Sequence, residues 1–247
     1  MKCIILAAGY ATRLYPLTKN FPKPLLEIKG KTIIDWLIDD VNSLNIVDEY
    51  VVVSNHKFID LFNKWQKEKG MSNITILDDG SMSNESRCGA VYDIMFAIKE
   101  KNLDDDLLIL PGDNVLDFSL KSFIDYFKIK KHSVIMRYYE EKTEKIKKSA
   151  CVLFDDNDKV LKMIEKPDSP VSNWCVPPFY IYSKKDLKTI QKALDDGCNK
   201  DAPGSLVSWL YDKKEIYAME MNGHRYDIGT IESYEKVKEI YQGVNRK

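Results

Sequence analysis

The feature that most constrains the fold is a regular alternation of short apolar segments with longer amphipathic ones. Apolar segments at 2–6, 50–54, 74–77, 107–110 and 133–137 have the length of strands, and apolar residues recur at helical spacing between them. This β-α-β-α-β-α-β order predicts the α/β class, with a mostly parallel central sheet covered by helices on both faces. In such sheets, ligands bind at the carboxyl ends of the strands.

The pattern changes after about residue 140. Two apolar segments, 152–155 and 160–165, flank the hairpin turn Asp156-Asn157-Asp158. Further elements are expected as strands at 177–182 and 216–221, and as helices at 184–195, 205–211 and 231–241. We therefore expect the second half to add a small β extension to the same domain.

The first strand runs directly into a block with the properties of an anion-binding loop. Small residues there let an anion approach the backbone N–H groups, and Arg13 and Lys23 add positive charge. Arg13 is one of five arginines against 32 lysines, and prolines on both sides restrict Lys23. The block favours a polyphosphate ligand over an ordinary buried strand followed by solvated cations. The residues at the strand end and turn are Leu6, Ala7, Ala8 and Gly9.

Two aspartates stand where an element ends. Asp113 follows the buried strand at 107–110, and Asp227 lies just before the expected helix at 231–241. A carboxylate at a strand end could hold Mg²⁺, which prefers oxygen ligands. From the residues alone, Asp113 is equally well explained as a cap of the next helix, and Thr230 could cap the last helix.

Composition excludes several classes of partner. The net charge is −1, so no basic field suits nucleic acid. The five cysteines are scattered without a C-x-x-C pair, as expected in a reducing compartment. No apolar stretch approaches the roughly 20 residues of a membrane span. We expect a cytoplasmic protein that binds neither nucleic acid nor membrane.

The chain resembles the sugar-1-phosphate nucleotidyltransferases in five motifs. T-R-L-x-P-L-T and P-K-P-L contain Arg13 and Lys23, G-D ends at Asp113, E-K-P spans 165–167, and D-x-G-T-x-x-S-Y begins at Asp227. One departure is Ala11, where the family usually has glycine. The resemblance implies a Rossmann-like fold of the glycosyltransferase-A type. It also implies one nucleotidyltransferase domain over 1–247, with about 1–140 binding nucleotide and about 141–247 binding sugar phosphate and closing the site.

The resemblance also implies roles for individual residues. Arg13 and Lys23 would be catalytic, and Mg²⁺ would be held by Asp113 and Asp227. The sugar phosphate would be bound by Glu165 and Lys166. The nucleotide would be bound by Leu6, Ala7, Ala8, Gly9, Gly89 and Asp113.

The implied reaction joins a nucleoside triphosphate to a sugar 1-phosphate and releases pyrophosphate. Three alternatives remain open. Bacterial phosphocholine cytidylyltransferases share the N-terminal signature, and Tyr138, Tyr139, Trp174, Phe179 and Tyr180 could line a pocket for a quaternary ammonium. A non-catalytic sensor of nucleotides or sugar phosphates is a second, and a glycosyltransferase a third. The base, the acceptor and self-association as a homo-oligomer also stay open.

Overall fold

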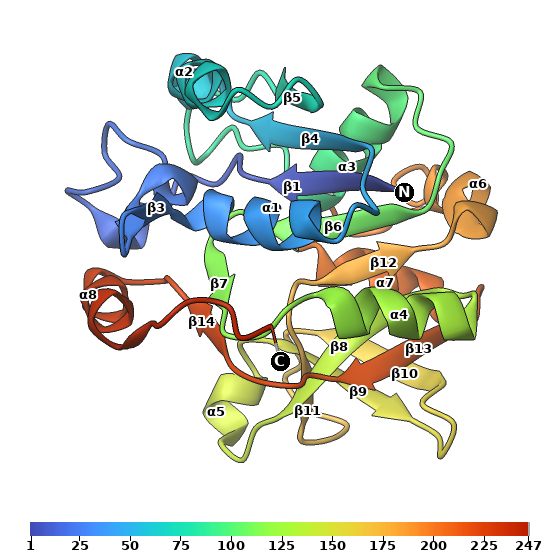
Figure 1. Ribbon diagram of the computed structural model, residues 1–247. Helices are drawn as coiled ribbons and strands as arrows, with labels where there is room; N and C mark the ends of the chain where they lie inside the picture. Colours follow the sequence, from blue (N-terminus) through green and yellow to red (C-terminus); the bar gives the residue numbers. More distant parts are fainter. Residues whose placement is uncertain (247) are drawn as a thin grey trace. The chain divides into compact units, whose positions relative to one another are not determined.

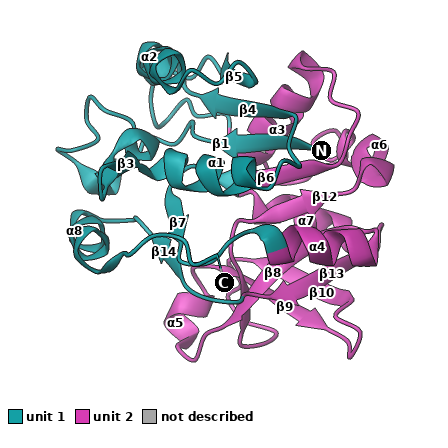
Figure 2. Cartoon of the chain, in the orientation of Figure 1, with its two compact units in different colours: residues 1–88, 110–121, 222–247 teal, residues 89–109, 122–221 magenta. Residues whose placement is uncertain are grey.

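Residues 1–246 are described in the computed structural model, so Lys247, the last residue of the expected domain, lies outside the described residues. Two compact units make up the chain, and each is assembled from separate stretches of sequence (Figure 2). Unit 1 consists of residues 1–88, 110–121 and 222–247, and unit 2 of residues 89–109 and 122–221. The expected division near residue 140 into two functional parts stays a prediction.

Unit 1 contains a parallel sheet that alternates with helices along the chain. Strand β4 (Glu49–Ser54) pairs in parallel with both β1 (Lys2–Leu6) and β5 (Ile74–Asp78). Helix α1 (Ile33–Ser43) lies between β1 and β4 in the sequence, and α2 (Ile59–Lys69) between β4 and β5 (Figure 1). Residues 50–53 are fully buried, as expected for a strand that is covered on both faces.

The limits of α1 follow from local chemistry. The Asp35 N–H donates to the Thr32 hydroxyl at 3.2 Å, which makes Thr32 the N-cap. The apolar residues of the helix recur at three- and four-residue spacing and are buried: Ile33, Ile34, Leu37, Ile38 and Val41. One face of α1 therefore belongs to the core of unit 1.

Unit 1 also contains two short antiparallel pairs of strands and the last helix of the chain. Strand β2 (Glu27–Ile28) pairs with β3 (Lys31–Thr32), and β7 (Asn114–Leu116) pairs with β14 (Arg225–Asp227). Helix α8 (Ile231–Ile240) begins with a capping box between Thr230 and Ser233.

Unit 2 contains a mixed sheet around β8 (Ser133–Tyr139). Strands β11 (Trp174–Val176) and β12 (Tyr180–Tyr182) pair antiparallel with β8, and β13 (Ile216–Glu220) pairs parallel with it. Further antiparallel pairs join β12 to residues 107–109 of β6 (Leu107–Pro111), β11 to β9 (Ala150–Phe154), and β9 to β10 (Val160–Glu165). The helices along this part of the chain are α3 (Ala90–Glu100), α4 (Lys121–Lys130), α5 (Thr143–Ile146), α6 (Leu187–Ile190) and α7 (Gly204–Leu210).

The predicted α/β class is confirmed, and the antiparallel strands β9 to β11 form the expected β extension. Two elements are shorter than expected. The helix expected at 184–195 is a 3₁₀ turn followed by α6, after which tight turns lead to Gly197 at φ +86°. The strand expected at 177–182 begins only at Tyr180, because Pro177 and Pro178 lack the N–H that a ladder needs. Among the described residues, no helix has the length and apolar character needed to cross a membrane.

Candidate active site

The loop that follows β1 is held by hydrogen bonds within unit 1. The Asn55 side-chain amide donates to the Ala8 carbonyl at 3.0 Å, and the Tyr10 hydroxyl donates to the Ser81 carbonyl at 2.8 Å. All four residues lie at or near the carboxyl ends of β1, β4 and β5. The loop therefore has a defined shape at the sheet edge where an α/β protein binds its ligands.

Two residues of this loop place different demands on the backbone. No described atom lies within 4 Å of a Cβ placed on Gly9, so the space over Gly9 is open. Ala11, in contrast, has φ +48° and ψ +42°, the left-handed region that favours glycine. The Thr18 hydroxyl donates to the Ala11 carbonyl at 2.8 Å and helps to hold this conformation. The departure from the family's glycine is therefore an alanine in a glycine-like conformation.

A pocket of about 310 Å³ opens over the loop within unit 1. Predicted site residues on its wall are Leu6, Ala7, Gly9, Arg13, Lys23 and Asp113. Ala8 is buried and does not line it. Asn84 and Arg87, from the loop after β5, complete the polar part of the wall. The pocket thus has two arginines and one lysine against one carboxylate, a balance that suits an anion.

Lys23 is buried, and its ammonium group is held in place on two sides. Its Nζ donates to Asp113 Oδ2 at 2.6 Å and to the Ile228 carbonyl at 2.7 Å. Burial is the largest single influence on Asp113 and would raise its pKa, but the Lys23 charge and the hydrogen bonds from Lys23 and Asn114 together outweigh it, so the pKa of the carboxyl is lowered. Asp113 is therefore a carboxylate at neutral pH, and Lys23 keeps one direction for a further acceptor.

The two predicted metal ligands come together through strand pairing. Asp227 is paired with Asn114 in the β14–β7 ladder, and the Ile228 N–H donates to the Asp113 carbonyl at 3.3 Å. A Cβ placed on Gly229 would lie 3.4 Å from Arg13 Nη2 and 3.8 Å from Asp227 Oδ2. The guanidinium group and the second carboxylate thus face the same glycine.

The donor set fits Mg²⁺ bound together with substrate. Mg²⁺ takes oxygen ligands, and it commonly uses one or two carboxylates while water and phosphate oxygens complete the octahedron. Residues 1–246 contain no cluster of three or more histidine, cysteine or acidic side chains placed to hold a metal. Asp113 and Asp227 therefore suit an ion that arrives with a triphosphate, and they do not form a complete protein cage.

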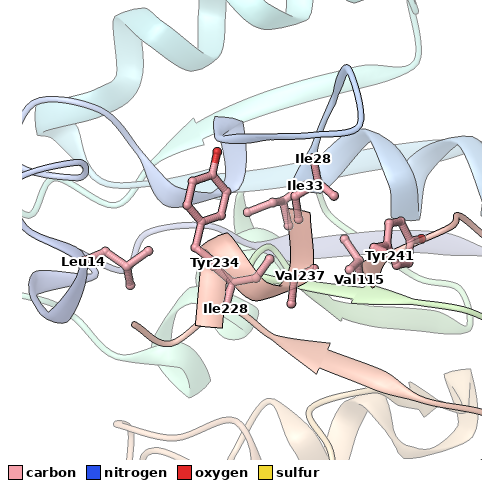
Figure 3. Close-up of a cluster of buried hydrophobic side chains, with 8 residues drawn as sticks. All are labelled: Leu14, Ile28, Ile33, Val115, Ile228, Tyr234, Val237 and Tyr241. Atoms are coloured by element: carbon pink, nitrogen blue, oxygen red, sulfur yellow. The ribbon is translucent and has the colours of Figure 1, made fainter. Parts of the chain in front are cut away.

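A hydrophobic cluster in unit 1 supports these charged groups through their sequence neighbours (Figure 3). Leu14 follows Arg13, and Ile228 follows Asp227. The buried members are Leu14, Ile28, Ile33, Val115, Ile228, Tyr234, Val237 and Tyr241. Packing of the apolar neighbours fixes the backbone from which the charged side chains project.

Sequence analysis missed the next residues in the hydrogen-bond network. The Asn114 side-chain amide donates to Asp113 Oδ1, and Arg225 Nη1 donates to Asn114 Oδ1 at 2.7 Å. Arg225 is another of the rare arginines and lies two residues before Asp227, hence on the same face of β14. The two-residue spacing between Arg225 and Asp227 was the one sequence signal for this role. The pairing of β7 with β14 could not be predicted, because both strands have three residues and lie far apart in the sequence.

The glycine before Asp113 is required by packing. A Cβ on Gly112 would lie 2.9 Å from the Leu6 carbonyl oxygen and 3.1 Å from Pro24 Cγ. The Gly112 N–H also donates to that Leu6 carbonyl at 2.9 Å. The absent side chain therefore allows the turn that carries Asp113 to lie directly against the end of β1.

Gly89, predicted to bind the nucleotide, lies in unit 2 and has a structural role there. Its φ is +100°, and a Cβ would collide with the Lys200 carbonyl. The next two N–H groups donate to backbone carbonyls: Ala90 to Asp201 at 3.1 Å, and Val91 to Lys200 at 3.0 Å. Close packing at the start of α3 explains this glycine, and its binding of the nucleotide stays a prediction.

Glu165 and Lys166 line a pocket of about 480 Å³ within unit 2. The extended conformation of β10 ends at Glu165, because Lys166 has φ +48°. The Lys166 N–H donates to the Ser149 carbonyl at 3.0 Å, and its Nζ lies 4.0 Å from Asp201 Oδ2. This turn lets two neighbouring side chains reach one pocket, which a continuous strand would not allow.

Glu165 occupies the more buried position of the two. Burial raises the pKa of Glu165, Lys166 opposes the shift, and Asp201 adds to it. A Cβ on Gly204 would collide with Glu165 Oε2, so the glycine at the start of α7 makes room for the carboxyl. The turn after β10 and the glycine of α7 therefore place the Glu165 carboxyl in the pocket of unit 2.

One ring of the aromatic set proposed for a quaternary ammonium, Trp174, lies beside a cation of the chain itself, together with Phe154, which was not in that set. The Arg137 guanidinium lies 3.7 Å from the ring centroid of Phe154 and 5.2 Å from that of Trp174. Tyr139 packs edge-on against Trp174, and Arg137 also pairs with Asp158 at 2.7 Å. These rings therefore take part in an internal cation–π arrangement.

Comparison with known proteins identifies the family of the chain. The model of the family described as "Nucleotidyl transferase" matches residues 2–243. The chain therefore belongs to the nucleotidyl transferase family. The residues predicted to bind phosphate, Arg13 and Lys23, lie in its unit 1.

Individual relatives are distant in sequence and close in fold. A glucose-1-phosphate adenylyltransferase of Lachnospira eligens is 25% identical over 95% of this chain and 58% of its own length. A solved UDP-glucose pyrophosphorylase in complex with UDP-glucose is 20% identical, with a TM-score of 0.79 and 97% of each chain covered. A solved CTP:phosphocholine cytidylyltransferase from Streptococcus pneumoniae is 21% identical, with a TM-score of 0.76 over 98% of this chain and 99% of that chain. The chain spans 51% to 64% of the length of the curated relatives it matches.

Proposed function

We propose that the chain transfers a nucleotidyl group from a nucleoside triphosphate to a sugar 1-phosphate in an Mg²⁺-dependent reaction. The observation that carries the proposal is the unit 1 pocket, where Arg13, Lys23 and Asp113 meet over an open glycine loop. Asp227 faces the same turn as Arg13. The motifs that resemble the sugar-1-phosphate nucleotidyltransferases and the names of the adenylyltransferase and pyrophosphorylase relatives support this choice.

The chemistry needs positioned charge and no general base. A phosphomonoester has a second pKa of about 6, so its oxygen is already an anionic nucleophile at neutral pH. That oxygen attacks the α-phosphorus, a new phosphoanhydride bond forms, the bond between the α- and β-phosphates breaks, and pyrophosphate leaves. Bound Mg²⁺ would neutralise phosphate charge and align the phosphates, with Asp113 and Asp227 as its ligands.

Each cationic side chain binds a different phosphate group. Arg13 binds the phosphates that leave as pyrophosphate, because a guanidinium can bind phosphate with two hydrogen bonds. Lys23, held by Asp113 and the Ile228 carbonyl, offers its charge to the reacting phosphate. In unit 2, Lys166 exchanges its weak pairing with Asp201 for the acceptor phosphate, and Glu165 accepts hydrogen bonds from sugar hydroxyls.

A phosphocholine acceptor is the second candidate, favoured by the fold of the S. pneumoniae cytidylyltransferase. The Arg137 position among the aromatic rings favours the sugar instead, since Phe154 and Trp174 already surround a cation. The choice between the two acceptors is open to direct measurement.

A screen of pyrophosphate release tests the proposal. The purified chain is incubated with Mg²⁺, each nucleoside triphosphate in turn, and a panel of sugar 1-phosphates plus phosphocholine. We expect release with at least one sugar 1-phosphate, and loss of release on adding EDTA or replacing Asp227 with Asn. Release only with phosphocholine would replace the sugar assignment, and no release with any pair would contradict nucleotidyl transfer.

A further inference from the structure

Ser208, on α7, has a buried hydroxyl oxygen without a hydrogen-bond partner in the described part of the chain. A serine within a helix commonly bonds to a carbonyl of the preceding turn or to solvent. Leaving a buried hydroxyl unpaired is costly, so each such group calls for an explanation. Ser208 also lines the 480 Å³ pocket and is the one unpaired buried group on its wall among the described residues.

The helix directs Ser208 toward the same side as Glu165. Gly204 and Ser208 are four residues apart on α7 and therefore share a face of the helix. The Glu165 carboxyl packs directly against Gly204. Ser208 and Glu165 thus line the same pocket from two different elements, α7 and β10.

The polar groups of this pocket suit hydroxyl recognition. A carboxylate accepts hydrogen bonds only, whereas a serine hydroxyl can both donate and accept. Together they can satisfy a sugar hydroxyl in both directions. The aromatic side chain of the pocket is Trp209, and the Lys213 ammonium lies 4.5 Å from its ring centroid. A cation of the chain already occupies this ring, which disfavours it as a site for a ligand ammonium.

We propose that Ser208 is a specificity-determining residue that forms a hydrogen bond with a hydroxyl of the acceptor, so that the pocket selects a polyhydroxylated monosaccharide phosphate. This inference rests on the proposed nucleotidyl transfer and adds a residue to its acceptor site. Ser208 pairs with the sugar, and Lys166 binds the phosphate. An acceptor without the matching hydroxyl leaves Ser208 unpaired and is used less well.

The test compares Ser208→Ala with Ser122→Ala, the same substitution on α4 outside the pocket. KM and kcat are measured for the best sugar 1-phosphate, for its monodeoxy analogues and for phosphocholine. In Ser208→Ala we expect KM for the sugar phosphate to rise about five- to tenfold, the worth of one hydrogen bond. KM for the triphosphate stays unchanged, and Ser122→Ala behaves as wild type. For one deoxy analogue, KM should be the same in Ser208→Ala as in the wild type, because the hydroxyl that this analogue lacks is the partner of Ser208.

Calorimetric titration with the sugar 1-phosphate measures binding independently of turnover. The conservative variant Ser208→Thr keeps a hydroxyl and should retain most of the affinity for the sugar 1-phosphate. Equal losses for every analogue and for phosphocholine, or no change in sugar binding, would overturn the role of Ser208 while leaving nucleotidyl transfer intact. If no sugar 1-phosphate supports pyrophosphate release in the wild type, the proposed function fails first, and this inference fails with it.

Discussion

The two units differ in how they hold their buried acidic groups. In unit 1, the buried Lys23 ammonium is already paired with the Asp113 carboxylate, and the pKa of that carboxyl is lowered. In unit 2, burial raises the pKa of Glu165, and the Ser208 hydroxyl has no partner in the described chain. The charges of Lys23 and Asp113 are thus paired with each other, whereas the pocket of unit 2 contains a hydroxyl that has no partner among the described residues.

This contrast suggests how selectivity and catalysis are divided. Charge that neutralises phosphate works best when it is fixed before the substrate arrives, because no reorganisation is then needed during the reaction. Groups that recognise hydroxyls gain selectivity when they are unpaired until the right acceptor binds. We therefore expect substitutions in unit 1 to change rate and triphosphate use, and substitutions in unit 2 to change acceptor choice.

The largest effect is expected from the two metal-side carboxylates. Asp227→Asn should reduce kcat/KM at least about a hundredfold, because several kcal/mol of charge stabilisation depend on a charged ligand. Since the Asp227 side chain is exposed, the melting temperature of the Asp227→Asn variant should equal that of the wild type. Asp113→Asn should reduce activity as strongly and also lower the melting temperature, because it leaves the buried Lys23 without its counter-charge.

Asp48→Asn, an exposed aspartate beside the N-terminus, is the matched control and should change neither quantity. Near-normal Mg²⁺-dependent turnover in either site variant would remove that residue from the metal site.

A pair of glycine substitutions separates packing from ligand space in unit 1. Gly112→Ala should destabilise the fold by about 1–3 kcal/mol, because its Cβ would press against the end of β1. Gly9→Ala should leave stability nearly unchanged, since no described atom lies within 4 Å of the added carbon, but it should weaken triphosphate use. Denaturant unfolding and triphosphate KM provide the two readouts. A Gly9→Ala enzyme with wild-type KM would show that the open space is not used by the ligand.

Features that are local in the sequence could be predicted, whereas features that depend on distant pairing and packing could not. The α/β class was predictable, because it depends on the alternation of short apolar and longer amphipathic segments, which is local in the sequence. Gly9 and Arg13 were singled out from one contiguous string of residues, and both line the unit 1 pocket. The link from Arg225 through Asn114 to Asp113 was not predictable, since it depends on the ladder between β7 and β14, two three-residue strands far apart in the sequence. The role of Ser208 was also hidden, because an unpaired hydroxyl is a property of packing and has no sequence signature.

The stability effect of pH should have opposite signs in the two units. Because the folded state favours neutral Glu165, its ionised form costs stability at neutral pH, so Glu165→Gln should raise the melting temperature slightly at pH 7–8. The gain should disappear below about pH 4, where the wild-type acid is neutral in both states. Asp113 has a lowered pKa, so its contribution is present above its ordinary pKa and is lost as the pH falls through the folded pKa.

Thermal melts between pH 3 and 8 on wild type, Glu165→Gln and the exposed control Glu100→Gln test this difference. A gain for Glu165→Gln that is the same at pH 4 and pH 7.5 would mean that charge burial is not its cause.

The smallest effect concerns the left-handed alanine. Ala11→Gly relieves a conformation that costs an alanine about 1–2 kcal/mol, but glycine also loses more entropy on folding, so we expect a net gain of at most about 1 kcal/mol. Ala97→Gly, in the interior of α3, should instead lose about 1 kcal/mol. Urea unfolding distinguishes the two, and a loss for Ala11→Gly comparable to that for Ala97→Gly would contradict a strained loop.

The most direct test of the division between the units is a crossed kinetic comparison of Arg13→Ala with Lys166→Ala. Each variant is assayed for KM of the triphosphate and KM of the acceptor, with the other substrate saturating. The account predicts that Arg13→Ala raises mainly the triphosphate KM, whereas Lys166→Ala raises mainly the acceptor KM, for sugar phosphates and phosphocholine alike. If both variants raise both constants by similar factors, the assignment of triphosphate to unit 1 and acceptor to unit 2 is wrong.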